Sequence, residues 1–537
     1  MTSGALRNTL MMISLLTVVL TAHAQFGRAL TVARPSVLSP RLTPDEISTD
    51  LYNENYRPQF HFTPVRNWMN DPNGPIYYQG EYHLFYQYNP FGIEWGHMSW
   101  GHAISRDLVH WEHLPIALSE EKGVMIFSGS TVVDWHNSSG FCRAPGVEVP
   151  SCLVAIYTGQ SDKLETQNLA YSNDRGRTWT KYADNPVIDL HLASFRDPKV
   201  FWHEGTHRWV MVTVLSSQHK VRFFGSTDLR HWTALSDFGP EGATGGVWEC
   251  PDLFPLPVDG DASQTKWVLS VNVTPGAERG WSNQYFLGSF DGTSFSSESS
   301  AGKVLWVDCG ADFYASTSFS ELPKSDKRRI WMGWLTNWEY AARVPPDRWR
   351  GAQSIPREVR LRWFPDGIRL VQEPIVELRV LRARHTRVAN RSIEATNDLL
   401  KSKKVHGDTL EIAAEISAED AATFGIKVRE GDGEETVIGV DTKKQALFVD
   451  RTRSSDVFDK RFPGRDEGPI QLAAGKSVKL HIFVDRSSVE VFGNDGETVL
   501  SETIFPKPGS DGIELYSRDG QARVLKMDVW NLKSIYQ

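Results

Sequence analysis

Short runs of alternating hydrophobic and polar residues dominate the chain from about residue 60 to residue 370. These runs are rich in aromatic and β-branched residues, and clusters of Gly, Asn, Asp and Pro separate them. Amphipathic stretches of helical length are lacking in this part of the sequence. Because a period of two between turn residues is typical of strands, the pattern predicts an all-β structure.

One short phrase recurs in this region, in which an Asp precedes an aromatic residue by four or five positions. The pairs are Asp107 with Trp111, Asp174 with Trp179, Asp228 with Trp232 and Asp291 with Phe295. Each copy predicts a hairpin, in which a strand ends, the Asp supports the turn and the aromatic residue opens the next strand. The spacing suits four strands per copy, as in a β-propeller blade. Together with strand-like sequence at 60–90 and 328–370, the copies predict a five-bladed β-propeller at residues 57–372.

The pattern changes after about residue 375, where Trp becomes scarce. Regular alternation appears at 410–416, 479–484 and 488–492, and a Gly-Asn-Asp-Gly turn follows at 493–496. Alternating strands joined by tight turns favour a second all-β unit. We therefore expect a β-sandwich at residues 373–537.

The N-terminal segment predicts a secreted protein. Arg7 precedes an apolar stretch at 10–22, and the small-x-small sequence Ala22-His23-Ala24 follows. This is the pattern of a signal peptide, here residues 1–24. The apolar stretch is shorter than the ~20 residues of a spanning helix, so an uncleaved anchor is the lesser alternative and no membrane span is expected after cleavage. Residues 25–56 lack periodicity and are predicted to be a lead-in segment. The signal peptide predicts that the mature protein is extracellular or periplasmic.

Composition narrows the classes of function. The net charge is -8 and no dense Lys/Arg run occurs, which argues against nucleic-acid binding. The chain has 19 Trp, 15 Tyr and 26 Phe. Aromatic rings stack on sugar faces, so carbohydrate is the first ligand class to consider, although most of these rings are expected in the core. Neither CxxC nor HExxH occurs, so a metal site has little support.

The four cysteines are too few and too scattered for a disulfide framework. Cys142 and Cys152 could nevertheless close a surface hairpin in an exported protein. Sequons at Asn137, Asn272 and Asn390 could carry glycans in a eukaryotic host.

Three acidic residues, Asp71, Asp197 and Glu249, stand in aromatic-rich sequence with a Pro one or two residues later. Each Pro marks the end of a strand, and strand ends at a propeller axis would bring the three carboxylates together. Repulsion among the three carboxylates and their burial then raise the pKa of at least one of them. Glycoside hydrolysis needs such a set: one carboxylate attacks or stabilises the anomeric carbon, a protonated one donates to the leaving oxygen, and a third can hold hydroxyls. A single Asp-Pro is more often a turn, but three in this setting favour chemistry.

At 68–74 (Trp-Met-Asn-Asp-Pro-Asn-Gly), 195–198 (Phe-Arg-Asp-Pro) and 248–252 (Trp-Glu-Cys-Pro-Asp), the sequence resembles the motifs of glycoside hydrolase family 32. That family includes invertases, exo-inulinases and levanases, and the resemblance runs from about His61 to the C-terminus. It implies a propeller with a β-sandwich, Asp71 as nucleophile, Glu249 as general acid and base, and Asp197 as a holder of fructose hydroxyls. It also implies substrate contacts from Asn70, Asn73, Gln87, Trp95, Phe127, Ser128, Arg196 and Trp338.

The resulting expectation is a retaining, exo-acting β-fructosidase that releases terminal fructose from levan, inulin or sucrose and needs no cofactor. Residues 84–90, 100–107 and 484–493 look most like bacterial-type levanases and exo-inulinases. An invertase limited to sucrose and a fructosyltransferase share the same chemistry and stay open. A non-catalytic fructan-binding propeller and a pentose-cleaving propeller hydrolase are weaker alternatives. The sequence leaves the oligomeric state open.

Overall fold

The computed structural model describes residues 51–536, except 145, 147, 149, 278, 279, 299–302, 324, 346, 474 and 475. The predicted signal peptide and most of the lead-in segment lie outside the described residues. Within the described part of the chain, no helix has the length and apolar character needed to cross a membrane.

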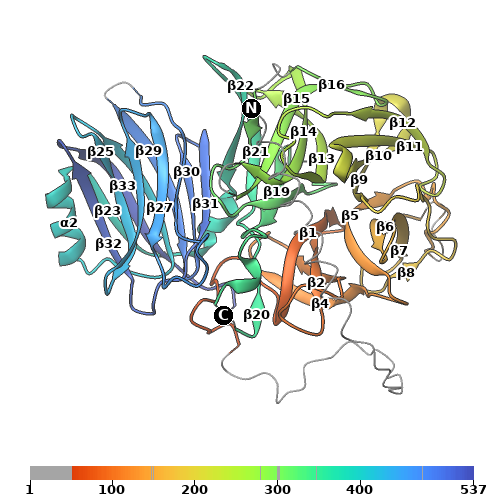
Figure 1. Cartoon of the computed structure of the whole chain (residues 1–537), viewed down its shortest axis with the longest axis horizontal. Helices are drawn as coiled ribbons and strands as arrows, with labels where there is room; N and C mark the ends of the chain where they lie inside the picture. The colour runs from red at the N-terminus through yellow and green to blue at the C-terminus, as the bar shows by residue number, and fades with distance from the viewer. Residues whose placement is uncertain are drawn as a thin grey trace, which may run out of the picture. The chain divides into compact units, whose positions relative to one another are not determined.

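Five antiparallel blades form the first part of the fold, as predicted (Figure 1). Blade 1 is β1 (Asn67–Tyr78), β2 (Glu81–Asn89), β3 (Ser99–Ser105) and β4 (Trp111–Leu118), with the short β20 (Trp349–Arg350) parallel to β1. Blade 2 is β5 (Met125–Asp134), β6 (Cys152–Gln160), β7 (Glu165–Ser172) and β8 (Thr180–Lys181). Blade 3 is β9 (Phe195–His203), β10 (Arg208–Leu215), β11 (Lys220–Ser226) and β12 (Thr233–Phe238).

Blades 4 and 5 hydrogen-bond into one larger sheet. Blade 4 is β13 (Val247–Val258), β14 (Asp261–Ala277), β15 (Gly280–Phe290) and β16 (Phe295–Ser297), with β17 (Leu305–Trp306) beside β15. Blade 5 is β18 (Tyr314–Ser318), β19 (Arg329–Trp334), β21 (Arg357–Phe364) and β22 (Gly367–Pro374). The first strands of the blades, β1, β5, β9, β13 and β18, contact one another in a ring around the axis.

The four predicted hairpins are the connections between the third and fourth strands of blades 1 to 4. Asp107 Oδ1 accepts backbone N–H bonds from Val109 (2.9 Å) and His110 (2.8 Å). Asp228 Oδ1 repeats this in blade 3, where it accepts from Arg230 and His231. The side chain of Asp thus supplies the acceptors that the turn backbone lacks, which explains the recurrence of Asp at this position.

The second part of the fold is a sandwich of two sheets, as predicted. One sheet has the order β23 (Arg382–Ser392), β33 (Arg523–Leu532), β24 (Leu410–Ser417), β29 (Ser477–Asp485), β30 (Ser488–Gly493) and β31 (Thr498–Thr503). The other has the order β28 (Arg465–Pro469), β27 (Ala446–Arg453), β26 (Glu434–Asp441), β25 (Thr423–Gly431) and β32 (Gly512–Arg518). The inward residues of the alternating strands form a continuous aliphatic core.

The sequence pattern did not predict α2 (Ile393–Ser402), the one α-helix among the described residues. The hydroxyl of Ser392 caps its N-terminus by accepting from the Ala395 N–H, and Ile393, Thr396 and Leu400 are its buried residues. Strand β22 ends at Pro374 and β23 begins at Arg382, so the change of architecture falls at 375–381.

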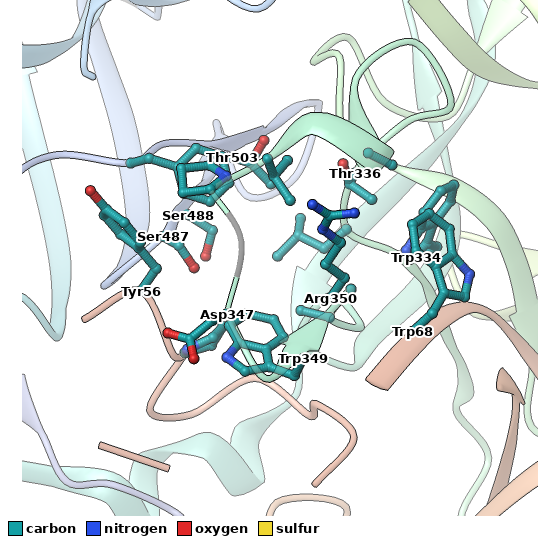
Figure 2. Close-up of a pocket in the computed structure, with 18 residues that line it drawn as sticks. Tyr56, Trp68, Trp334, Thr336, Asp347, Trp349, Arg350, Ser487, Ser488 and Thr503 are labelled. Carbon is teal, nitrogen blue, oxygen red and sulfur yellow. The ribbon is translucent and has the colours of Figure 1, made fainter. Parts of the chain in front are cut away.

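A small pocket of about 40 Å³ lies where the propeller meets the sandwich (Figure 2). Trp68 and Trp334 line it on the propeller side, while Ser487 and Thr503 line it on the sandwich side. Several lining polar atoms are buried without a hydrogen-bond partner, including Trp334 Nε1 and Thr336 Oγ1. A cavity of this volume and polarity has room for a few water molecules, so we regard it as hydrated packing space.

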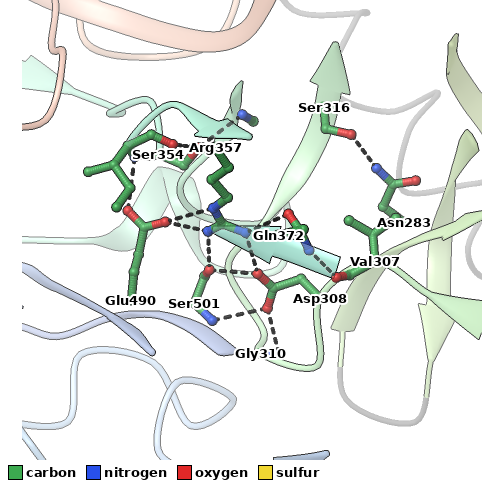
Figure 3. Close-up of polar contacts among 12 residues, drawn as sticks. Asn283, Val307, Asp308, Gly310, Ser316, Ser354, Arg357, Gln372, Glu490 and Ser501 are labelled. Atoms are coloured by element: carbon green, nitrogen blue, oxygen red, sulfur yellow. Dashed lines mark hydrogen bonds and ion pairs between the residues drawn. The ribbon is translucent and has the colours of Figure 1, made fainter. Parts of the chain in front are cut away.

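A buried ionic network also joins the two parts (Figure 3). Arg357 of β21 binds Asp308 (2.9 Å between Nη1 and Oδ2), Ser501 Oγ (2.6 Å) and Glu490 of β30. The ring nitrogens of His61 contact Asp485 (2.7 Å) and Glu490 (2.8 Å). Burying these carboxylates costs free energy, and only their ionic and hydrogen-bond partners offset that cost. The network therefore determines how β21 packs against β30 and β31.

Candidate active site

All five inner strands carry a break in register near their first residues. The breaks lie between Met69 and Pro72 in β1, Ile126 and Gly129 in β5, Glu249 and Asp252 in β13, and Tyr314 and Thr317 in β18, and opposite Val212 to Val214 in β9. Such bulges re-aim side chains. Asp197 (φ +62°), Cys250 (φ +46°) and Ala315 (φ +53°) adopt left-handed conformations at these breaks.

The three acidic residues therefore lie near the beginning of their strands, not at strand ends as the Pro residues suggested. Asp71, Asp197 and Glu249 are all within the first five residues of β1, β9 and β13. The following Pro lies within the register break in β9 and β13 and directly after it in β1, and a bulge tolerates Pro. The propeller brings the three carboxylates together, as expected, but at the opposite ends of the strands.

Asp71 is held in place by its neighbours on two blades. Its Oδ1 accepts from Asn70 Nδ2 (2.9 Å), and its Oδ2 accepts from Ser128 Oγ of β5 (3.0 Å). Burial raises the pKa of Asp71 to about 6, the charge of Glu249 adds to this, and the bonds from Asn70 and Ser128 act in the opposite direction. The carboxylate is thus fixed in orientation and is ionised above about pH 6.

Glu249 is connected to Arg196 and to Tyr314. Arg196 Nε donates to Glu249 Oε1 (3.2 Å), and the Tyr314 hydroxyl donates to Glu249 Oε2. The other guanidinium nitrogens of Arg196 donate to Glu165 Oε1 (2.6 Å) and Ser216 Oγ (2.9 Å). Arg196 therefore positions Glu249 by a fork whose second arm is anchored on blade 2.

Asp197 lies against Cys250. The backbone N–H of Cys250 donates to Asp197 Oδ2 (2.9 Å), and the Cys250 Sγ lies 3.6 Å from Oδ2 of both Asp197 and Asp71. Burial raises the pKa of Asp197; the charge of Arg196 opposes this rise and that of Glu249 adds to it. Burial and the nearby carboxylates raise the pKa of the free thiol of Cys250, which agrees with a packing role.

Aromatic rings form a wall beside the carboxylates. Trp95 is 45 % exposed, and its ring meets those of Phe127 (6.1 Å between centroids) and Trp338 (6.5 Å). Trp338 stacks on Trp68 (6.0 Å), whose Nε1 donates to Asn70 Oδ1 (2.8 Å). This wall links exposed indole surface to the residue that orients Asp71, an arrangement suited to a sugar ring.

Two predicted contact residues are not joined to this group by any contact that we observe among the described residues. Asn73 is fully buried on β1, and neither polar atom of its side-chain amide has a hydrogen-bond partner. Gln87 is buried on β2, and its Nε2 is also unpartnered. Both amides retain unused hydrogen-bonding capacity.

Sequence reasoning missed three residues that build the site. Glu165 anchors Arg196, and Tyr314 binds Glu249. Asn272 joins two inner strands, because its Nδ2 donates to Cys250 O (3.3 Å) and its Oδ1 accepts from Ala315 N–H (2.9 Å). None of them lies in one of the Pro-containing motifs that single out the three acidic residues. Their role is therefore visible only from their contacts in the folded structure.

The structure also decides two expectations about modification. Cys142 and Cys152 form a disulfide, with a Cα–Cα distance of 5.1 Å. Asn272 is fully buried, so its sequon is closed to glycosylation in the folded protein. Among the described residues, no group of three or more His, Cys, Asp or Glu side chains is arranged to hold a metal ion.

Known proteins are similar to this chain in sequence and in fold. The model of the glycosyl hydrolases family 32 N-terminal domain matches residues 61–374, and that of the family's C-terminal domain matches residues 377–531. A levanase from Bacillus subtilis (strain 168) is 50% identical over 508 residues, covering 93% of this chain and 74% of the levanase. An extracellular exo-inulinase from Aspergillus ficuum is 41% identical over 523 residues, covering 90% of this chain and 96% of the inulinase.

Solved structures agree. The exo-inulinase from Aspergillus awamori superposes with a TM-score of 0.83 at 39% identity, covering 90% of this chain and 99% of its own. The β-fructofuranosidase from Schwanniomyces occidentalis, complexed with fructosyl-erythritol, superposes with a TM-score of 0.81 at 31% identity, covering 91% and 99%. The chain belongs to glycosyl hydrolases family 32.

Proposed function

We propose that this protein is a secreted, exo-acting β-fructosidase that releases terminal fructose from β-fructans and sucrose with retention of configuration. The observation that carries the proposal is the group of Asp71, Asp197 and Glu249, joined through Arg196 and Cys250 at one end of the propeller axis. The names of the relatives supply the substrate class, and the carboxylates supply the chemistry.

In the first step, Asp71 attacks the anomeric carbon of the terminal fructose while the bond from that carbon to the leaving oxygen breaks. Glu249 gives its proton to the leaving oxygen, and a fructosyl ester of Asp71 remains. The bonds from Asn70 and Ser128 hold the attacking carboxylate in one orientation, which lowers the entropic cost of the step.

In the second step, water attacks the ester carbon and Glu249, now ionised, takes the proton of the water. The ester bond breaks, Asp71 leaves as a carboxylate, and fructose is released with its original configuration. Both steps use only carboxyl groups and water, so the chemistry requires no cofactor.

For the remaining site residues we propose contacts to the terminal fructose. Asp197 holds hydroxyl groups beside Asp71, and Asn70, Ser128 and Arg196 complete the polar side of the site. Trp95, Phe127 and Trp338 form its aromatic side. Asn73 and Gln87 belong to the same set, and their unpartnered amides support that assignment.

Levan is the polymer that we propose as the preferred substrate, since the levanase relative is 50% identical and the exo-inulinase relative 41%. We also propose that residues 1–24 are removed on export, since several relatives are named extracellular. On this assignment the propeller at 57–372 carries the catalytic site, and the sandwich at 373–537 supports it.

The test measures initial rates of fructose release from levan, inulin and sucrose by the mature protein, with glucose followed in parallel. We expect faster release from levan than from sucrose, one fructose at a time. Hydrolysis of sucrose alone would make the protein an invertase, and glucose appearing in excess of free fructose would make it a fructosyltransferase. Binding of fructan without release of any sugar would replace the proposal with a binding protein.

A further inference from the structure

A large cavity lies away from the carboxylates. It has a volume of about 1030 Å³, and the later parts of the inner strands line it. Tyr77 comes from the end of β1, Trp202 and His203 come from the end of β9, and Trp135 directly follows β5. The catalytic residues lie near the beginning of the same strands, so this cavity opens at the other end of the propeller axis.

The two ends of the axis are separate sites. Asp197 and His203 both belong to β9, and six residues of extended strand span about 20 Å. Between them, Lys199 Nζ donates to Ser318 O (2.7 Å) and lies 3.3 Å from Asp252 Oδ1. These buried contacts occupy the part of β9 that lies between Asp197 and the cavity.

Aromatic faces of fixed orientation line the cavity. Trp135 is 46 % exposed, and its Nε1 donates to Glu321 Oε2 (2.9 Å) while its ring meets that of Tyr78 (5.8 Å). Trp267 is half-buried against the rings of Phe201 (5.9 Å) and His203 (6.1 Å). Because neighbours already hold these indoles, a ligand that stacks on them loses little side-chain entropy.

The charges around the cavity disfavour an anionic ligand. Glu204 and Glu321 are exposed at the cavity. The two cationic side chains among the lining residues, Lys199 and Arg329, already have partners. Those of Lys199 are given above. Arg329 Nη1 donates to the carbonyl of Phe319 (3.2 Å), and its guanidinium lies over the ring of Phe254 (5.1 Å to the centroid). Burial lowers the pKa of His203, so that ring is neutral near pH 7. A sugar chain carries neutral hydroxyl groups that can donate hydrogen bonds to carboxylates, and its ring faces can stack on aromatic side chains. A sugar chain therefore suits this lining.

We propose that this cavity is a second carbohydrate-binding site, which holds a segment of fructan on the face of the propeller opposite the catalytic carboxylates. The choice of fructan as the sugar rests on the proposed function. A polymer held there keeps its free ends near the enzyme and raises their effective concentration at the active site.

The test is electrophoresis in native gels that contain levan, with all variants built on Asp71→Asn so that the polymer survives. Excess sucrose in the gel fills the active site, so the remaining retardation reports a second site. We expect levan to retard the Asp71→Asn protein, and Trp135→Ala to weaken this retardation about threefold or more. Trp135→Phe, which keeps a ring, is expected to retain most of it.

Trp363 provides the matched control, since its indole is 57 % exposed on β21 and does not line the cavity. Equal retardation of the Trp135→Ala and Trp363→Ala variants would overturn the proposal, as would the absence of any retardation in excess sucrose. In the active protein, Trp135→Ala is expected to leave sucrose hydrolysis unchanged and to slow hydrolysis of dilute levan.

The outcomes separate this proposal from the proposed function. Hydrolysis of levan without Trp135-dependent retardation would overturn the second site alone. Trp135-dependent retardation by levan in a protein whose active form releases no fructose would overturn the enzymatic proposal alone. Equal thermal unfolding of the Trp135→Ala and Trp363→Ala variants checks that the comparison reports binding.

Discussion

Asp71 and Glu249 have different hydrogen-bond partners, so single substitutions can separate their roles. We expect Asp71→Asn and Glu249→Gln each to lower turnover on sucrose by at least ~10²-fold, because one removes the nucleophile and the other the proton donor. Both replacements keep the shape of the side chain, so circular dichroism and thermal unfolding should match the parent protein. A parental rate in either variant would contradict the mechanism.

Ser128 gives a prediction about pH. Asp71 acts as an ionised nucleophile, and burial raises its pKa to about 6, so kcat/KM on sucrose should fall as the pH drops through about 6. The Ser128 hydroxyl bond favours the ionised form. Ser128→Ala is therefore expected to move this acid limb to higher pH.

A pH–rate profile of kcat/KM measures this shift. Ser263→Ala, at an exposed position of β14, serves as the control and should leave the profile in place. An acid limb at the same pH in the Ser128→Ala and parent proteins would show that another group controls it.

At the scale of the element, the hairpin aspartates are expected to stabilise their blades. Asp228 accepts bonds from the N–H groups of Arg230 (3.0 Å) and His231 (2.8 Å), and its Oδ2 lies 2.7 Å from the His231 ring. Burial acts to raise the pKa of Asp228, but the His231 ring and these N–H groups lower it to about 2. Asp228→Ala should lower the free energy of unfolding by about 1–3 kcal/mol.

The pH dependence of this effect has a defined sign. Because the pKa of Asp228 is depressed, its stabilisation is complete above about pH 4 and is lost as the pH falls toward 2. Urea unfolding at pH 7 and pH 3 tests this, with Asp162→Ala in an exposed turn as the control. An Asp228→Ala protein as stable as the control variant at pH 7 would argue against a structural role for the repeat.

At the scale of the whole molecule, Arg357 joins the propeller to the sandwich. Arg357→Leu leaves Asp308 buried without its cation and leaves Glu490 with His61 alone, so we expect a loss of about 3–5 kcal/mol in the free energy of unfolding. Arg360 lies on the same strand but is 49 % exposed, and Arg360→Leu is expected to cost about 0–1 kcal/mol.

Thermal unfolding together with residual sucrose activity measures both variants. The Arg357→Leu protein should lose activity at a lower temperature than the Arg360→Leu protein. Equal unfolding temperatures would show that the ionic network contributes no net stability.

Local sequence patterns were sufficient for much of the fold because they follow from short-range physics. The hairpin aspartates act within their own turns, and strand alternation follows from one buried and one exposed side of a strand. Helix α2 escaped prediction because its ten residues follow a strand pattern without a break, and only the Ser392 cap marks its start. The Pro residues after Asp71 and Asp197 were misread as strand ends because a bulge tolerates Pro as well as an end does.

By itself, the sequence determined the order of the all-β units and the three acids, since both depend on residues close together in the chain. Only the tertiary structure decided which partners these acids have. Glu165, Ser128 and Tyr314 lie on other blades, and ring closure of the propeller brings them to Arg196, Asp71 and Glu249, respectively. The same closure creates the aromatic cavity at the other end of the axis, because distant strands contribute its rings and no local pattern records which strands become neighbours.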